Sequence, residues 1–204
     1  MDFYSVEDER LYEIKIKKSA FICSLKNVKT IEDAKKFISE ISSEHKTATH
    51  NCWAYIIGDK GETAHSSDNG EPPGTAGKPM LNALMKHHAT DIVAVVTRYF
   101  GGVKLGIRGL IEAYGTAVEE TLSEEPLKKL VKYYNYEIIF DYAFFEIFKH
   151  AIKNYKAEIA ETEFTDKIKL KLKVEESDNE EIREYLLQHE KAGKLNLNFI
   201  GITE

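Results

Sequence analysis

The chain has 204 residues and a mass of 23.3 kDa, with 34 acidic residues against 28 lysines and arginines and a formal net charge of −6. Its 43% hydrophobic and 30% charged residues exclude a disordered or fibrous protein. The acidic balance excludes a protein that coats nucleic acid through net charge alone, although it leaves room for a local basic face.

Several further classes are set aside by what the sequence lacks. Cys23 and Cys52 stand in no CxxC or zinc-ligand pattern, so we expect buried thiols in a reducing cytoplasm and no metal site. Residues 1–18 have no charged segment followed by a long apolar run, so we expect no signal peptide. The apolar run 92–96 is too short to cross a bilayer, and no membrane partner is expected.

The first part of the chain predicts mixed strands and helices. Two strands, 11–17 and 20–25, should form a hairpin that turns near Lys18–Ser19. Thr30 and Asp33 are typical of a helix start, and apolar residues then recur at helical spacing. The remaining elements expected here are a strand at 52–57, a helix beginning near Thr75, a buried strand at 91–100 and a helix from about 105 to 123.

The second part follows a change in composition. Ten of the 12 glycines lie between Gly58 and Gly115, and no proline follows Pro126, which indicates a boundary near 126–134. The strands expected beyond it are 135–141, 157–164, 167–174 and 195–202, with helices at 144–154 and from a Ser177–Glu180 capping box to about 189. The order βαββαβ is that of a ferredoxin-like fold. We therefore predict an α+β chain with domains 1–130 and 131–204.

Two glycine-rich segments, 65–79 and 97–110, each lead into an expected helix. Such loops expose backbone N–H groups at a helix N-terminus, where the helix dipole favours anions. Five Lys and Arg residues against one acid, Asp91, give the stretch from Lys78 to Arg108 a net charge of +4. Cations beside aromatic rings suit phosphate contact and stacking on unpaired bases. The alternative is that the glycines only build tight corners between strand and helix.

The residues expected to bind an anion or nucleic acid lie in these two segments. They are Gly74, Thr75, Gly77 and Lys78 in the first segment, and Arg98, Tyr99, Gly101, Gly102, Lys104, Gly106, Arg108 and Gly109 in the second. Phe100 is expected either to stack on a base or to belong to the core.

Other patterns carry less weight. Pro79 follows Gly77-Lys78, so there is no Walker A loop, and no GxGxxG follows a strand; we expect no cofactor. His65, Asp68 and Glu71 are weak candidates for acid–base or nucleophilic catalysis, and an enzyme is the less favoured interpretation. The alternating lysines of 167–173 indicate a solvated sheet face or, as the alternative, a second nucleic-acid surface.

Segments 67–81 and 95–115, SDNGEPPGTAGKPML and VVTRYFGGVKLGIRGLIEAYG, resemble the two signature segments of the IMPACT/YigZ family. The resemblance covers most of 1–125, and the tail is similar to the C-terminal domain of the bacterial members. It implies an N-terminal domain like domain 2 of ribosomal protein S5 and a C-terminal domain like domain V of elongation factor G. Ile107 and Arg108 depart from the family pattern, which usually has small residues there.

The same resemblance implies a role in translation. Eukaryotic relatives regulate translation under amino-acid stress through a protein that controls an initiation-factor kinase. For the bacterial members a nucleic-acid or ribosome role is implied by domain likeness alone. Our leading hypothesis is a non-enzymatic cytoplasmic regulator that binds RNA or the ribosome. The alternatives are a module that binds a regulatory protein partner, and a hydrolase or transferase.

Overall fold

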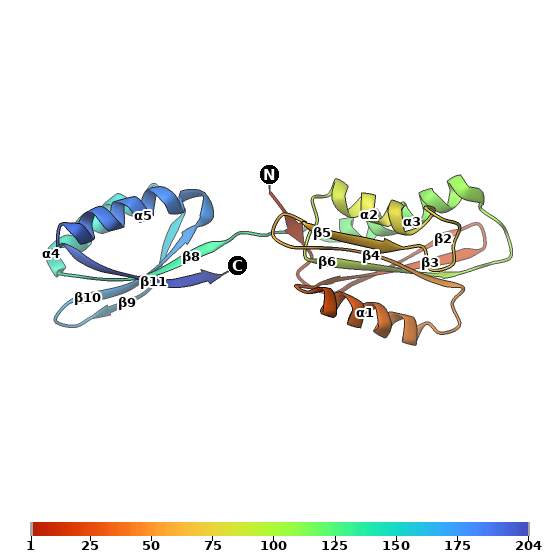
Figure 1. Ribbon diagram of the computed structural model, residues 1–204, viewed down its shortest axis with the longest axis horizontal. Helices are drawn as coiled ribbons and strands as arrows, with labels where there is room; N and C mark the ends of the chain where they lie inside the picture. The colour runs from red at the N-terminus through yellow and green to blue at the C-terminus, as the bar shows by residue number, and fades with distance from the viewer. Residues whose placement is uncertain (1, 204) are drawn as a thin grey trace. The chain divides into compact units, whose positions relative to one another are not determined.

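The computed structural model describes residues 2–203, which divide after Leu130 into two compact units (Figure 1). Both units combine helices with antiparallel sheets, so the predicted two-domain α+β class is confirmed. No helix among the described residues is long and apolar enough to cross a bilayer.

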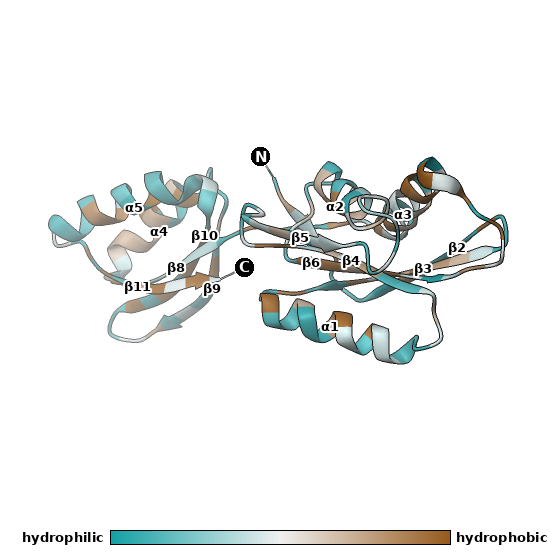
Figure 2. Cartoon of the chain, turned by 45° about the vertical axis from the view of Figure 1, so that its right-hand side comes forward, coloured by the Kyte–Doolittle hydropathy of each residue, from teal (hydrophilic) through white to brown (hydrophobic). Residues whose placement is uncertain are grey.

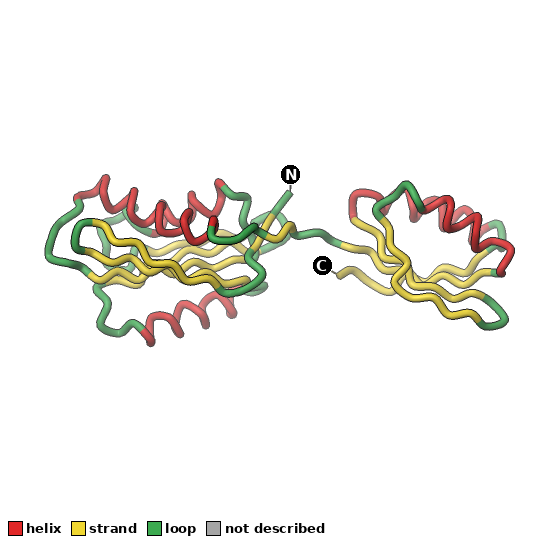
Figure 3. The backbone as a smooth tube through the Cα atoms, turned by 180° about the vertical axis from the view of Figure 1, so that it is seen from behind, coloured by secondary structure: helices red, strands yellow, loops and turns green. Residues whose placement is uncertain are grey.

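The first unit is built on a five-stranded antiparallel sheet with the strand order β2-β3-β6-β4-β5. The helix that begins at Ile31 covers one face of this sheet, and the helices that begin at Gly77 and Gly106 cover the other (Figures 1 and 3). The strands are β2 (Arg10–Ile16), β3 (Ser19–Asn27), β4 (His50–Ile57), β5 (Thr63–Ser67) and β6 (Ile92–Tyr99), and the helices are α1 (Ile31–Glu44), α2 (Gly77–Lys86) and α3 (Gly106–Ser123). Two short strands, β1 (Tyr4–Ser5) and β7 (Lys128–Lys129), pair with each other.

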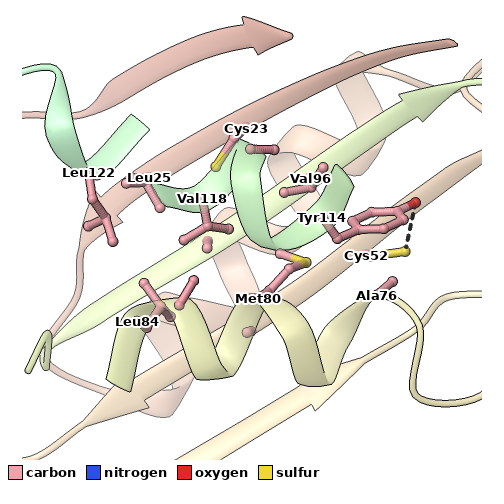
Figure 4. Packing of buried hydrophobic residues seen from close by; sticks show 14 of the residues in the cluster. Cys23, Leu25, Cys52, Ala76, Met80, Leu84, Val96, Tyr114, Val118 and Leu122 are labelled. Atoms are coloured by element: carbon pink, nitrogen blue, oxygen red, sulfur yellow. Dashed lines mark hydrogen bonds between the residues drawn. The ribbon is translucent and has the colours of Figure 1, made fainter. Parts of the chain in front are cut away.

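Strand β6 lies at the centre of this sheet, which explains its Ile/Val-rich sequence. Val93 and Val95 pack under α1, whereas Ala94 and Val96 face α2 and α3. A strand covered on both faces loses the alternation of polar and apolar residues, and Figure 2 shows the resulting apolar run. Figure 4 shows the larger of the two cores, in which side chains of α2 and α3 interdigitate above the sheet.

The second unit has the predicted ferredoxin-like topology. Its elements are β8 (Tyr133–Phe140), α4 (Tyr142–Ile152), β9 (Ala157–Phe164), β10 (Ile168–Glu175), α5 (Glu176–Lys191) and β11 (Leu195–Thr203). The sheet order is β11-β8-β10-β9, and every pair is antiparallel. Alternate residues of β10 are buried under the helices, while Lys169 pairs with Glu137 and Lys171 with Glu161 on the other face. These carboxylates weaken the alternative of a second nucleic-acid surface.

Three local predictions differ from the structure. The hairpin turns at Lys17–Lys18 rather than at Lys18–Ser19, because Ile16 pairs with Ser19. Strand β5 was not expected, because its residues are mostly polar and it pairs only with β4 at the sheet edge. The Ser177–Glu180 capping box is wrong: α5 begins two residues earlier than a Ser177 N-cap would place it, and its N-cap Glu175 makes no side-chain capping bond.

Because α1 has a side-chain cap and α5 has none, we expect removal of a hydroxyl at the two helix N-termini to change stability differently. Thr30 Oγ1 accepts a hydrogen bond from the Asp33 backbone N–H at 3.1 Å, so Thr30→Ala should lower the free energy of unfolding by about 1 kcal/mol. Ser177→Ala should leave it unchanged, because the Ser177 hydroxyl bonds only to carboxylates of its neighbours Glu175 and Asp178. Urea denaturation followed by circular dichroism measures both; equal losses would contradict this assignment of the caps.

Candidate functional site

The first glycine-rich segment folds around the carboxylate of Asp68. Its Oδ1 accepts the backbone N–H groups of Ala76 at 3.0 Å and Gly77 at 2.9 Å, and its Oδ2 accepts that of Gly74 at 2.8 Å. Burial opposes ionisation of Asp68, but these bonds from Gly74, Gly77 and Ala76 outweigh it and lower the pKa of the carboxyl. The N-terminus of α2 thus already holds an anion, which is the chain's own side chain.

This arrangement corrects the expectation of an external anion at Gly74, Thr75 and Gly77. A Cβ at Gly77 would come within 2.8 Å of the Ser67 backbone, so this glycine serves a close approach inside the protein. Thr75 is buried, and its hydroxyl donates to the Pro72 carbonyl at 2.7 Å. Only Lys78 of the four expected residues presents an exposed charged side chain.

A buried ion pair joins this segment to the central strand. Arg98 and Glu71 are 5% and 7% exposed, and Arg98 Nη1 donates to Glu71 Oε1 at 2.5 Å. Tyr114 of α3 donates its hydroxyl to the same oxygen at 2.9 Å, and His50 Nε2 lies 3.8 Å from the other carboxylate oxygen. Arg98 is therefore an internal counter-ion, which corrects its expected role as an exposed phosphate contact.

The three weak catalytic candidates do not share partners. His65 lies exposed on β5 with its ring beside Tyr55, Asp68 faces backbone amides, and Glu71 faces Arg98. Among the described residues, no hydrogen bond or ion pair links these three side chains, which removes support for a proton relay.

The thiols are equally poor nucleophile candidates. Burial raises the pKa of both Cys23 and Cys52 to about 12, and a thiolate is the reactive form. Figure 4 shows Cys52 pointing at the Tyr114 hydroxyl, 3.4 Å away. Across residues 2–203, no three His, Cys, Asp or Glu side chains cluster closely enough to hold a metal ion.

The second glycine-rich segment borders a groove of about 410 Å³. Apolar side chains form most of its wall, and two of them are open to solvent: Phe100 is 43% exposed and Ile107 is 66% exposed. The groove is lined by Thr49, His50, Glu71, Pro72, Arg98, Phe100, Lys104, Leu105, Gly106, Ile107 and Leu110. Helix α3 begins here at Gly106 (φ +78°), and its N-cap Leu105 makes no side-chain capping bond.

The other expected residues of this segment fall into different roles. Tyr99 is half-buried, and its hydroxyl lies 2.9 Å from His45 Nδ1, so its ring does not face the groove wall. Gly109 packs on Leu105, where an added Cβ would come within 3.0 Å. Gly102 has φ +83° and open space around it.

The positive charge of the stretch 78–108 is largely paired. Besides Arg98, Lys86 bonds to Glu119 at 2.8 Å and Arg108 bonds to Glu112 at 2.9 Å. Among the described residues, Lys104 has no ion pair and is exposed. The net +4 read from the sequence therefore overstates the free charge of this face.

The structure adds two cations that the sequence did not connect with this loop. A Cβ at Gly101 would overlap the Lys18 carbonyl oxygen, so the β2–β3 turn lies directly against the second glycine-rich segment. Lys17 and Lys18 of this turn are exposed, and neither forms an ion pair with another residue of the described chain. Gly101, where a Cβ would overlap the backbone of the turn, was the available signal for this contact.

Comparison with known proteins shows that both units match families. Residues 17–122 match the model described as "Impact N-terminal domain", and residues 138–187 match "Domain of unknown function (DUF1949)". "IMPACT family member YvyE" of Bacillus subtilis is 37% identical over 188 residues, which is 91% of this chain and 86% of the relative. "IMPACT family member" of Haemophilus influenzae is 36% identical and covers 95% of each chain. A solved structure titled "Crystal structure of an hypothetical protein" has a TM-score of 0.64, 30% identity and 98% coverage of both chains.

The buried ion pair predicts a non-additive response to mutation. Arg98→Met should lower the free energy of unfolding by about 3–5 kcal/mol, because Glu71 would stay buried without its counter-ion. The double variant Arg98→Met/Glu71→Met should lose less than the single variant. Chemical denaturation tests this, and a double variant that loses the sum of both single losses would contradict the pairing.

The three backbone hydrogen bonds to the Asp68 carboxylate predict that stability depends on pH. Because the pKa of Asp68 is lowered in the folded chain, the unfolded chain takes up the proton first as the pH falls. The stabilisation is complete above the ordinary pKa of 3.8 and is lost as the pH falls through the lower folded pKa. Thermal unfolding of wild type and Asp68→Asn should differ most near neutral pH and converge in acid; a difference that grows in acid would contradict this.

Proposed function

The chain belongs to the IMPACT family, and from this premise we propose that it is a non-enzymatic cytoplasmic regulator of translation that binds single-stranded RNA through its second glycine-rich segment. The translational setting rests on the family. The RNA ligand rests on the groove at the start of α3 and on the cations around it.

One observation supports the proposal: unpaired lysines from separate parts of the chain lie along the second glycine-rich segment, which leads into α3. The backbone of Lys18 lies against Gly101, and Lys104 lines the groove. The α3 N-terminus adds unbonded backbone N–H groups and the positive end of the helix dipole. Positive charge and exposed backbone beside an apolar groove suit a sugar–phosphate chain.

The rings and apolar walls supply the second half of such a site. The Phe100 ring is 43% exposed, and the Arg98 guanidinium lies 5.3 Å from its centroid, which fixes the ring at the groove. Any unpaired base can stack on an aromatic ring, and such stacking contributes about 1–3 kcal/mol of binding free energy per base. The site is thus suited to unpaired RNA rather than to a duplex, whose bases are covered.

A protein partner is the second candidate, and exposed isoleucines favour it. Ile107 is 66% exposed and Ile111 is 41% exposed, one turn apart on α3. Such side chains are typical of the anchors through which a helix docks on another protein. The two candidates use overlapping surfaces, so experiments must separate charge from apolar contact.

RNA binding is tested by charge reversal. We expect Lys18→Glu/Lys104→Glu to weaken binding of a single-stranded RNA oligonucleotide at least tenfold and to flatten its salt dependence by roughly 1.4 in the slope of log K against log salt. The control Lys35→Glu/Lys60→Glu changes the net charge equally with exposed lysines of α1 and of the turn 58–61, and it should bind like wild type. Fluorescence anisotropy at several salt concentrations measures both.

Two results would count against RNA. If both double variants lose RNA affinity equally, the effect comes from net charge and not from the site. If Lys18→Glu/Lys104→Glu leaves the affinity unchanged, these lysines do not contact RNA. The protein alternative makes a different prediction: the neutral change Ile111→Ser, at an exposed residue outside the groove lining, should weaken a nuclease-resistant complex while leaving RNA affinity within about twofold.

A further inference from the structure

Strand β2 is one of the two edge strands of the five-stranded sheet. It pairs with β3 along its whole length, from Arg10 opposite Leu25 to Ile16 opposite Ser19, and no described strand pairs with its other side. The strand is seven residues long, without proline or a bulge. An edge of this regularity is a template for another strand unless the protein blocks it.

The β2–β3 turn determines which backbone groups face outward. The loop between Ile16 and Ser19 has two residues, so these flanking residues exchange hydrogen bonds with each other. Because the pattern alternates along an antiparallel strand, Leu11, Glu13 and Lys15 direct their N–H and C=O groups away from β3. These groups remain available to a neighbouring strand.

The side chains of these outward-facing residues form a self-complementary set. Leu11 is 62% exposed, and the side chains of Glu13 and Lys15 are 40% and 79% exposed and lie 3.2 Å apart. They lie on the face of the sheet that α1 covers mainly over β4 and β6. We propose that β2 pairs with β2 of a second copy of this chain, antiparallel and centred on Ile14, which joins two sheets into one.

The charges select this register. Centred on Ile14, each Glu13 lies opposite the partner's Lys15, twice by symmetry, while Leu11 lies at the end of the pairing, where the partner's strand turns away after Ile16. A register centred one residue earlier would set two Glu13 carboxylates opposite each other, and one residue later would set two Lys15 ammonium groups opposite each other. Opposite charges across strands stabilise a sheet, and like charges destabilise it.

The other face of the strand fits the same register. Tyr12, Ile14 and Ile16 alternate with the charged residues, and both isoleucines pack partly buried against the core under α2 and α3. Pairing about Ile14 brings Ile14 opposite the partner's Ile14 and Tyr12 opposite the partner's Ile16. Aromatic and β-branched pairs of this kind are favourable across strands. Lysine on an edge ordinarily prevents such pairing, but here each Lys15 meets a carboxylate.

Charge exchange tests the proposal on the full chain. Sedimentation velocity should show a dimer whose population rises with concentration. Glu13→Lys alone and Lys15→Glu alone should each raise the dissociation constant roughly tenfold, because each turns two attractive pairs into two repulsive ones. Glu13→Lys/Lys15→Glu should restore it to within about twofold of wild type. The control Glu32→Lys on α1 changes the charge as Glu13→Lys does and should leave the dimer intact.

Hydrogen exchange provides an independent readout. The amides of Leu11, Glu13 and Lys15 should be protected at high concentration and exchange rapidly on dilution, while the pairing amides of β3 stay protected throughout. Circular dichroism confirms that each variant is folded. A chain that is monomeric at all concentrations, a dimer indifferent to both single reversals, or a double variant no better than the single variants would each overturn the proposal.

Discussion

The buried ion pair between Glu71 and Arg98 is the interaction on which the rest of the first unit's site depends. Glu71 comes from the first glycine-rich segment, Arg98 from the end of β6, and Tyr114 from the middle of α3, and all three meet at one carboxylate oxygen. A buried pair contributes little net stability compared with apolar residues, but it penalises any arrangement that separates its members. It therefore fixes both loops relative to the sheet and holds Arg98 below the Phe100 ring.

Each of the two glycine-rich segments leads to a helix N-terminus whose first backbone N–H groups need partners, and the two segments meet this need differently. Helix α2 begins under the carboxylate of Asp68, which satisfies its free amides from within the chain. Helix α3 begins at Gly106 without a capping side chain, next to Lys104 and the turn that carries Lys18. An internal anion closes one helix N-terminus, and the absence of a capping side chain at the other leaves it to solvent or a ligand. The similar appearance of the loops in the sequence conceals this division.

The elements follow from local patterns, whereas the site follows from contacts that local patterns do not contain. The apolar run of β6 and the Thr30 cap of α1 are visible in the sequence because burial and capping act on neighbouring residues. Strand β5 is not visible in the sequence, because an edge strand needs no apolar face. Arg98 is read as an exposed cation because a single sequence does not show that Glu71 lies beside it. Lys18 and Gly101 are more than eighty positions apart in the sequence, so the local spacing of apolar residues could not predict their contact.

The binding of an external anion at α3 and not at α2 is tested by NMR titration of the isotopically labelled chain with a single-stranded RNA oligonucleotide. The backbone amide signals of Gly102, Lys104 and Gly106 should shift with a common affinity. The amide signals of Gly74, Ala76 and Gly77, which are bonded to Asp68, should stay in place. Shifts confined to the α2 amides, or none at either helix, would contradict it.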